Sequence, residues 1–163
     1  MNCTCFQYSA LELDRRSINK RIKATAAILK PLVLLAENPT LRLKLLRCPH
    51  CAQHWQTGWE WSLRGSEYAY HVPEIDLADW QQEPYLQPAA WMVYGAMMEP
   101  YYAKNTFEPS NKPCGVAGCP HRAIRFSGVC EPHHVEQLQQ FGMLPKRPVG
   151  RLFPPYGATA PAA

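Results

Sequence analysis

The chain has 163 residues, of which 47% are hydrophobic, and it carries a formal net charge of +4. This length is typical of one compact domain with its own core, and the 16 prolines argue against a bundle of long helices. The longest apolar stretch, residues 28–36, is interrupted by Lys30 and Pro31 and is too short to cross a bilayer, and the polar first twenty residues do not resemble a secretory signal. We therefore expect a cytoplasmic protein.

The charge is unevenly distributed along the chain. Residues 1–47 contain nine Lys/Arg and three Asp/Glu, residues 48–111 contain two and eight, and residues 112–163 contain six and two. The acidic central segment also holds all five tryptophans and six of the eight tyrosines. Acidic residues repel phosphate backbones, so this segment is expected either to fill the core or to form a protein-binding surface.

A basic helix is predicted near the start of the chain. Ser9 and Glu12 have the spacing of a capping box, and a helix is expected over residues 10–30, ended by Pro31. One face of this helix is apolar, whereas the other carries only basic charge: Arg15, Arg16, Lys20, Arg21 and Lys23. Such a face is usually only solvated, and contact with DNA or RNA is its functional alternative.

Alternating apolar residues then predict three antiparallel strands. Leu41, Leu43 and Leu45 alternate with charged residues. The alternation resumes over residues 55–63, with Gln56 on the polar face, and returns over residues 68–72 after Arg64-Gly65. We expect a meander with the sequence Cys48-Pro49-His50-Cys51 in its first turn.

Helices are predicted after the meander. The pattern is weakly helical over residues 76–82 and more strongly over 88–99, where Pro88 suits the first helical position and Pro100 should end or kink the helix. Residues 103–113 are predicted to be a loop. A last helix is expected from Pro132 to Phe141 with Gly142 as its cap, followed by an extended proline-rich tail from Pro145.

The pattern C-x4-C-x10-C-x2-H near the end of the chain predicts a zinc site formed by Cys114, Cys119, Cys130 and His133. Glycines in the C-x4-C loop let two sulfurs converge, a short hairpin is expected through residues 123–126, and the last two ligands lie three residues apart at a helix start. About twenty residues thereby resemble a short treble-clef-like zinc motif, which occurs in proteins of many functions. Two rival ligands remain open: His121 and His134.

A second zinc site is predicted from the remaining cysteines. The Cys48–Cys51 pair lies between two strands, where zinc-ribbon-like knuckles lie, and Cys3 and Cys5 are its natural complement because structural zinc takes four protein ligands. His54 and His71 are the substitutes if Cys3 and Cys5 do not reach the knuckle.

Catalysis is not expected. The sequence C-P-H-C is identical to the active-site motif of thioredoxin-fold disulfide oxidases, but that chemistry needs the first thiol at a helix N-terminus, and the residues after Cys51 alternate like a strand. The pair His133-His134 resembles part of a treble-clef metal-dependent nuclease, but the further Asn and His residues of such a site are not found at suitable spacing. No phosphate loop or nucleophile elbow is present.

These observations predict an α+β protein in which a small antiparallel meander packs with N-terminal, central and C-terminal helices and two structural Zn²⁺ ions. We expect an α+β core over residues 1–111, a zinc module over 112–144 and the extended tail over 145–163. The predicted function is non-catalytic protein binding by an adaptor, inhibitor or immunity-type protein, through the acidic Trp/Tyr-rich centre. The alternative is nucleic-acid binding through the basic helix and the basic residues of the C-terminal module: Arg122, Arg125, Lys146, Arg147 and Arg151.

Overall fold

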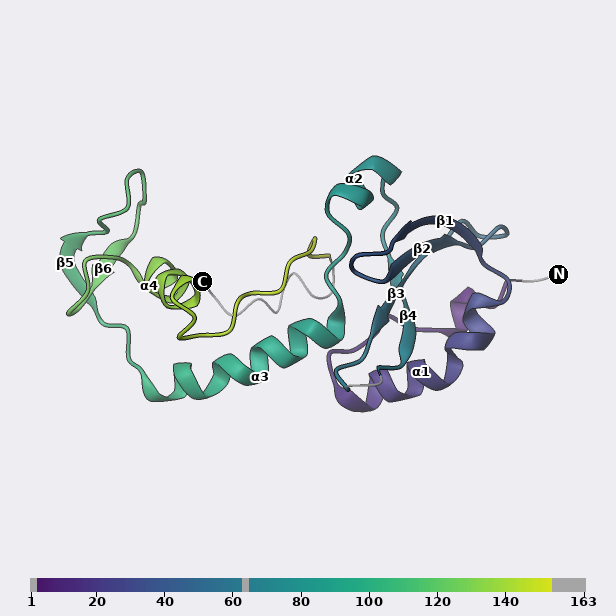
Figure 1. Ribbon diagram of the computed structural model, residues 1–163, viewed down its shortest axis with the longest axis horizontal. Coiled ribbons are helices and arrows are strands. Elements are labelled where there is room, and N and C mark those ends of the chain that lie inside the picture. Colours follow the sequence, from purple (N-terminus) through teal and green to yellow (C-terminus); the bar gives the residue numbers. More distant parts are fainter. Residues whose placement is uncertain (1–2, 63–64, 154–163) are drawn as a thin grey trace. The chain divides into compact units, whose positions relative to one another are not determined.

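The computed structural model describes residues 3–62 and 65–153 (Figure 1). These residues form two compact units, the first with residues 3–62, 65–93 and 148–153 and the second with residues 94–147. Helices and an antiparallel sheet are both present, so the α+β prediction is confirmed.

The first unit is built on a four-stranded antiparallel sheet. Its order is β1-β2-β3-β4, formed by β1 (Val33–Asn38), β2 (Leu43–Arg47), β3 (His54–Trp59) and β4 (Glu67–Val72). The meander was predicted with three strands, and β1 is the strand that was missed. It is an edge strand with a bulge between Leu34 and Ala36, and it buries only Ala36, so its sequence shows no alternation.

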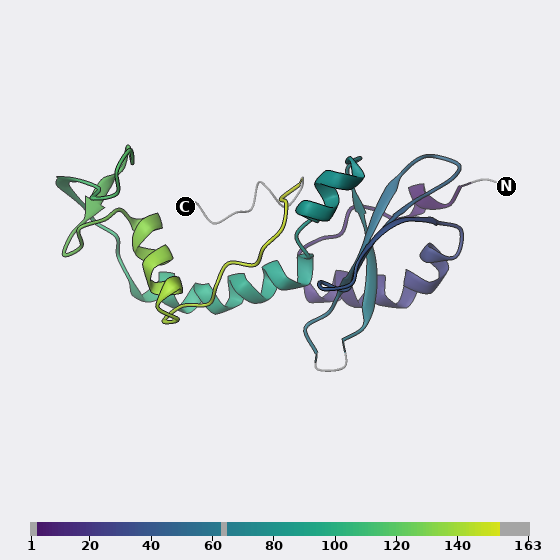
Figure 2. The same cartoon turned by 45° about the horizontal axis from the view of Figure 1, so that its top comes forward.

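The helix α1 (Arg15–Leu29) covers one face of this sheet and packs against β4 (Figures 1 and 2). The prediction that Ser9 caps the helix was wrong, because the cap is Asp14, whose carboxylate accepts the backbone N–H of Ser17 at 2.9 Å. The carbonyl of Ser9 instead accepts a hydrogen bond from the guanidinium of Arg21 at 2.7 Å. The helix ends at Leu29, before Pro31, as predicted.

The opposite face of the sheet is also covered, by α2 (Leu77–Gln82) and the segments around Tyr85 and Phe153. Gln56, which was predicted on the polar face of its strand, therefore has a fully buried side chain. Its amide oxygen accepts from Trp80 Nε1 (2.7 Å) and from the Tyr85 backbone (3.1 Å), and its amide nitrogen donates to the Tyr70 hydroxyl and to the Tyr85 carbonyl. Every hydrogen-bonding position of this buried amide is thus used.

The described part of the tail, residues 146–153, contains no helix, and its end belongs to the first unit. Arg151 exchanges backbone hydrogen bonds with Pro84 and Leu86, and Phe153 is buried against Tyr70 and Tyr85. Gly150 permits this approach, because its φ is 144° and a Cβ there would lie 2.6 Å from the Leu86 backbone.

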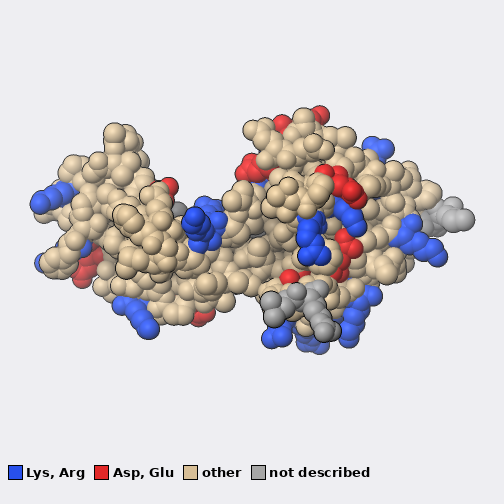
Figure 3. Space-filling view, viewed as in Figure 1, with Lys and Arg blue, Asp and Glu red and all other residues tan. Residues whose placement is uncertain are grey.

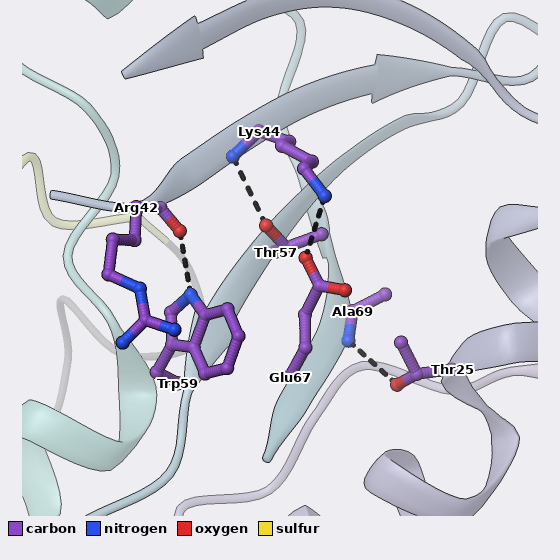
Figure 4. Close-up of polar contacts among 7 residues, drawn as sticks. All are labelled: Thr25, Arg42, Lys44, Thr57, Trp59, Glu67 and Ala69. Atoms are coloured by element: carbon purple, nitrogen blue, oxygen red, sulfur yellow. Dashed lines mark hydrogen bonds and ion pairs between the residues drawn. The ribbon is translucent and has the colours of Figure 1, made fainter. Parts of the chain in front are cut away.

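The loop between β1 and β2 is held by an arginine–tryptophan contact (Figure 4). The indole N–H of Trp59 donates to the carbonyl of Arg42 at 2.7 Å, and the Arg42 guanidinium lies 3.7 Å from the Trp59 ring centre. Trp59, one of the less buried central aromatics, is therefore already paired with a cation of its own chain. Lys44 and Glu67 form a separate ion pair across the sheet at 3.3 Å.

The helix α3 (Pro88–Lys104) begins in the first unit and ends in the second, and it continues through Pro100 rather than ending there. Residues 103–113 are not all loop, because β5 (Pro109–Pro113) pairs with β6 (Arg122–Ile124). This pairing replaces the hairpin predicted within residues 123–126. The last helix, α4 (Glu131–Gln140), ends as predicted beside Gly142, whose φ is 71°.

Candidate metal centres

The first cysteine cluster joins the start of the chain to the turn between β2 and β3. Cys5 begins the short 3-10 helix η1 (Cys5–Gln7), and the turn carries Cys48 and Cys51. Two backbone hydrogen bonds close the turn, from Cys48 N to the Gln53 carbonyl (2.9 Å) and from Ala52 N to the Cys48 carbonyl (3.0 Å). The turn requires a left-handed residue at Ala52, whose φ is 60°.

The four thiols of this cluster lie at distances that suit a shared ion. The Sγ atom of Cys3 is 3.2 Å from that of Cys51 and 3.5 Å from that of Cys48, and all four ligand atoms, including that of Cys5, lie within 4.8 Å of one another. All are free cysteines, since a disulfide would bring two sulfurs to about 2.05 Å. A tetrahedral Zn–S distance of about 2.3 Å places sulfurs about 3.8 Å apart. The cluster could therefore hold a metal ion.

Backbone amides favour the thiolate form of one ligand. Burial raises the pKa of Cys48, but the backbone N–H groups of Cys51 and His50 and neighbouring thiols outweigh it and lower the pKa to about 7. Burial dominates at Cys5 and raises its pKa above the usual range. A bound cation would lower the pKa of Cys5 again, because coordination deprotonates a thiol.

Trp55 forms a second layer behind the first cluster. Its indole is fully buried, and its Nε1 has no hydrogen-bond partner among the described residues. The indole N–H nevertheless lowers the pKa of the Cys5 thiol, against the larger effect of burial. The indole N–H is thereby positioned to stabilise a thiolate at Cys5.

The second cluster lies in the second unit. Cys114 follows β5, Cys130 caps α4, and His133 lies in the first turn of α4. His133 Nδ1 is 3.3 Å from the Sγ atom of Cys114 and 3.2 Å from that of Cys130, and Cys119 Sγ is 3.7 Å from Cys130 Sγ. These four ligand atoms also lie within 4.8 Å of one another, so this cluster could hold a second metal ion.

Close backbone contacts shape the second cluster. The N–H of Gly115 donates to the Gly128 carbonyl at 2.8 Å, and a Cβ on Gly115 would lie 3.0 Å from that oxygen. The N–H of Cys130 donates to Cys114 Sγ at 3.3 Å. Burial raises the pKa of Cys114, but hydrogen bonds from Val116 and Cys130 and from His133 lower it to about 6. Amide donors therefore favour a thiolate here too.

The structure brings together the eight residues predicted as ligands and leaves the rival histidines outside both groups. The first group is Cys3, Cys5, Cys48 and Cys51, and the second is Cys114, Cys119, Cys130 and His133. His54 is buried, and His71 lies 3.9 Å from Trp55, ring centre to ring centre. His121 and His134 are likewise not members of the second group. The role of Trp55 was missed, because a tryptophan in an alternating strand is usually only core.

The Cys48-Pro49-His50-Cys51 turn joins two strands. Its first thiol is almost completely buried and is not placed at the start of a helix. Thioredoxin-type redox chemistry depends on such a start, because the helix dipole activates the thiol. The local geometry instead fits a metal-binding knuckle.

Comparison of the chain with protein-family models, with curated proteins and with solved structures found no match. Among the described residues, none of the helices is long and apolar enough to span a bilayer.

Proposed function

We propose that this protein is a non-catalytic nucleic-acid-binding protein stabilised by two structural Zn²⁺ ions. Four thiolates, or three thiolates and an imidazole, are a ligand set that zinc prefers, and four protein ligands leave no coordination position for a substrate. The metals would stabilise the fold, so the function has to come from the surface.

The exposed face of α1 carries this proposal. At about 100° per residue, the exposed positions of the helix cover roughly 140° of its circumference. Counting the C-cap Lys30, five of them are basic and none is acidic: Arg15, Arg16, Lys20, Lys23 and Lys30. The exposed residues between these cations are small or neutral: Asn19, Ala26 and Ala27. Figure 3 shows Lys and Arg side chains gathered along the edge where Figure 1 places α1.

The cations of this face are available to an external anion. No salt bridge among the described residues involves any of the five, although Arg15 lies over the ring of Trp61. The face is about 22 Å long, which matches the rise of about six base pairs. Cations without an acidic partner at this density favour phosphate binding, which gains from the release of condensed counterions.

Protein binding through the acidic centre is the second candidate. Acidic side chains surround α2 (Figure 3), and the exposed ones include Glu74, Asp76, Asp79 and Glu83, with Leu77 exposed beside them. This surface would suit a basic protein partner of an adaptor, inhibitor or immunity-type protein.

The burial of the aromatic anchors makes us place this candidate second. Seven of the central aromatics are buried: Trp55, Tyr68, Tyr70, Trp80, Tyr85, Trp91 and Tyr94. Trp61 is more exposed, but Arg15 already lies over its ring. Protein interfaces depend on large exposed anchors, and the acidic surface offers few of them.

The test is salt-dependent binding of a fluorescent DNA duplex by the zinc-loaded full chain. We expect Lys20→Gln/Lys23→Gln to weaken binding and to reduce the slope of log K against log salt by about 1.8, since each lost phosphate contact removes about 0.9. The matched control Arg47→Gln/Lys104→Gln removes the same charge from exposed positions outside α1 and should change the slope much less. Equal effects of the two variants would contradict the assignment to α1.

A further inference from the structure

The tight turn that follows β6 in the second unit exposes a phenylalanine completely. Ser127 N donates to the Ile124 carbonyl at 3.1 Å, so Arg125 and Phe126 are the two central residues of a β-turn. Phe126 has a φ of 64° and a relative exposure of 102%. A turn with positive φ at its third residue normally takes glycine or asparagine, because a Cβ is strained there. Folding alone therefore does not account for an exposed aromatic ring at this position.

The backbone on both sides of Phe126 is fixed. Ile124 N donates to the Val129 carbonyl at 2.9 Å, and Arg125 N donates to the Glu108 carbonyl at 2.8 Å. The Gly115–Gly128 hydrogen bond ties the end of the turn to the C-x4-C loop, and Cys130, a predicted metal ligand, follows shortly after. The second metal cluster thus holds the turn that presents the ring.

The charged residues around Phe126 are one acid, Glu108, and several bases. Arg125 lies beside the ring, with its guanidinium 5.8 Å from the ring centre, and also pairs with Glu108 at 3.1 Å. Arg122 on β6 and Lys112 on β5 are exposed on the same two-stranded sheet. An anchor for a protein pocket would be surrounded by apolar contacts, whereas an exposed ring among cations suits a base that stacks and a backbone that is negatively charged.

We propose that Phe126 is a stacking platform for an unpaired base of single-stranded nucleic acid, with Arg122, Arg125 and Lys112 holding the adjacent phosphates. The inference rests on the proposed nucleic-acid function and specifies its ligand. A base within a duplex is already stacked on its neighbours, so only a single strand offers the free face that the ring needs. The second unit then supplies a contact that the basic face of α1, which meets only phosphates, cannot supply.

The test measures binding of the zinc-loaded full chain to single-stranded DNA and RNA oligonucleotides of about 20 nucleotides and to the corresponding DNA duplex. Phe126→Ala should weaken single-strand binding about tenfold and leave duplex binding almost unchanged, whereas Phe126→Trp should keep single-strand affinity because it keeps the stacking face. Comparing the DNA and RNA strands shows which of the two the platform serves.

A third variant separates binding from folding. Phe126→Gly removes the strain at positive φ, so its thermal unfolding should occur at or above the wild-type temperature while its single-strand affinity falls as in Phe126→Ala.

The inference is overturned if Phe126→Ala binds single strands like the wild type, if it loses duplex binding equally, or if it changes only self-association or binding of a protein. If Lys20→Gln/Lys23→Gln weakens binding and Phe126→Ala does not, only this inference fails. If the wild type binds neither strands nor duplex, the proposed function fails with it.

Discussion

The hydroxyl of Thr25 in α1 accepts the backbone N–H of Ala69 in β4 at 3.1 Å (Figure 4). β4 is an edge strand, and among the described residues no further strand lies on that side for Ala69 to bond with. The Ala69 carbonyl accepts from Arg21 of the same helix at 3.4 Å. Two polar side chains of α1 therefore satisfy the outer edge of β4, which explains why both are buried and protects the edge from pairing with another chain.

Removing the Thr25 hydroxyl should destabilise the first unit without changing its shape. We expect Thr25→Val to lower the free energy of unfolding by about 1–3 kcal/mol, because a buried N–H loses its acceptor while the side-chain volume is kept. Thr25→Ser is the matched control, since it keeps the hydroxyl and should cost less than Thr25→Val. Urea unfolding followed by tryptophan fluorescence reports on the first unit, which contains all five tryptophans. Equal losses in the two variants would contradict the role of the hydrogen bond.

The strands that the sequence failed to predict lacked a local signal. Residues 33–38 form an edge strand that buries one residue, so the period-two pattern of a half-buried strand is absent. The five residues of β5 contain two prolines and no large apolar side chain, and they pair only through partners more than eight residues away. In both segments the partner strand, rather than the local sequence, determines the conformation.

The unpredicted burial of Gln56 has a different physical origin. The alternation placed this residue on the side of β3 opposite Trp55. The structure shows the same alternation, because Gln56 bonds to Trp80 and Tyr85 whereas Trp55 packs beside Cys5. The segments that cover the Gln56 side come from residues 77–89 and from Phe153, which are distant in sequence. A strand pattern reports which residues share a face, but it cannot report that a later segment will bury the polar face and satisfy its amide. The metal ligands were easier to predict, because ligand chemistry and spacing fix them locally.

Ala52 occupies a position in the first knuckle where glycine is favoured. Its φ of 60° strains any residue with a Cβ, so Ala52→Gly should raise the free energy of unfolding by up to about 1 kcal/mol. Ala27→Gly is the opposite control, because Ala27 is exposed in the last turn of α1 and its replacement relieves no strain, so it should cost about 0.5–1 kcal/mol. Urea unfolding of the zinc-loaded proteins measures both changes. A loss of stability in Ala52→Gly as large as that in Ala27→Gly would contradict the strain at residue 52.

Trp55 should control how tightly the first cluster holds its metal. Trp55→Phe keeps most of the ring volume but removes the N–H that favours the thiolate at Cys5, so we expect zinc affinity at this centre to fall about tenfold. Trp80→Phe is the matched control, because it removes a buried indole N–H that bonds to Gln56 instead of a thiol. Competition with a chromogenic chelator measures the affinity. If the two variants release zinc alike, Trp55 acts only as core.

His71 links the stability of the first unit to pH. Burial and, to a smaller extent, the positive charge of Arg21 lower the pKa of His71 to about 4. An unfolded histidine titrates near pH 6.5, so below that pH the unfolded chain binds a proton that the folded chain resists. The neutral side chain therefore contributes its full stability above about pH 6.5, and this contribution is lost as the pH falls towards 4.

Replacing His71 should flatten this pH dependence. We expect the free energy of unfolding of the wild type to fall between about pH 7 and about pH 5 by about 1–2 kcal/mol more than that of His71→Phe, a magnitude reduced for the partial exposure of the ring. Zinc release at low pH acts on both proteins, so the difference between them isolates the histidine. His121→Gln removes an exposed histidine from the second unit and serves as the control.

Because His71 Nε2 is buried without a partner among the described residues, His71→Phe should also be at least as stable as the wild type at the lower pH. Urea unfolding curves that stay parallel for the wild type and His71→Phe across this range would show that His71 does not set the acid sensitivity of the first unit.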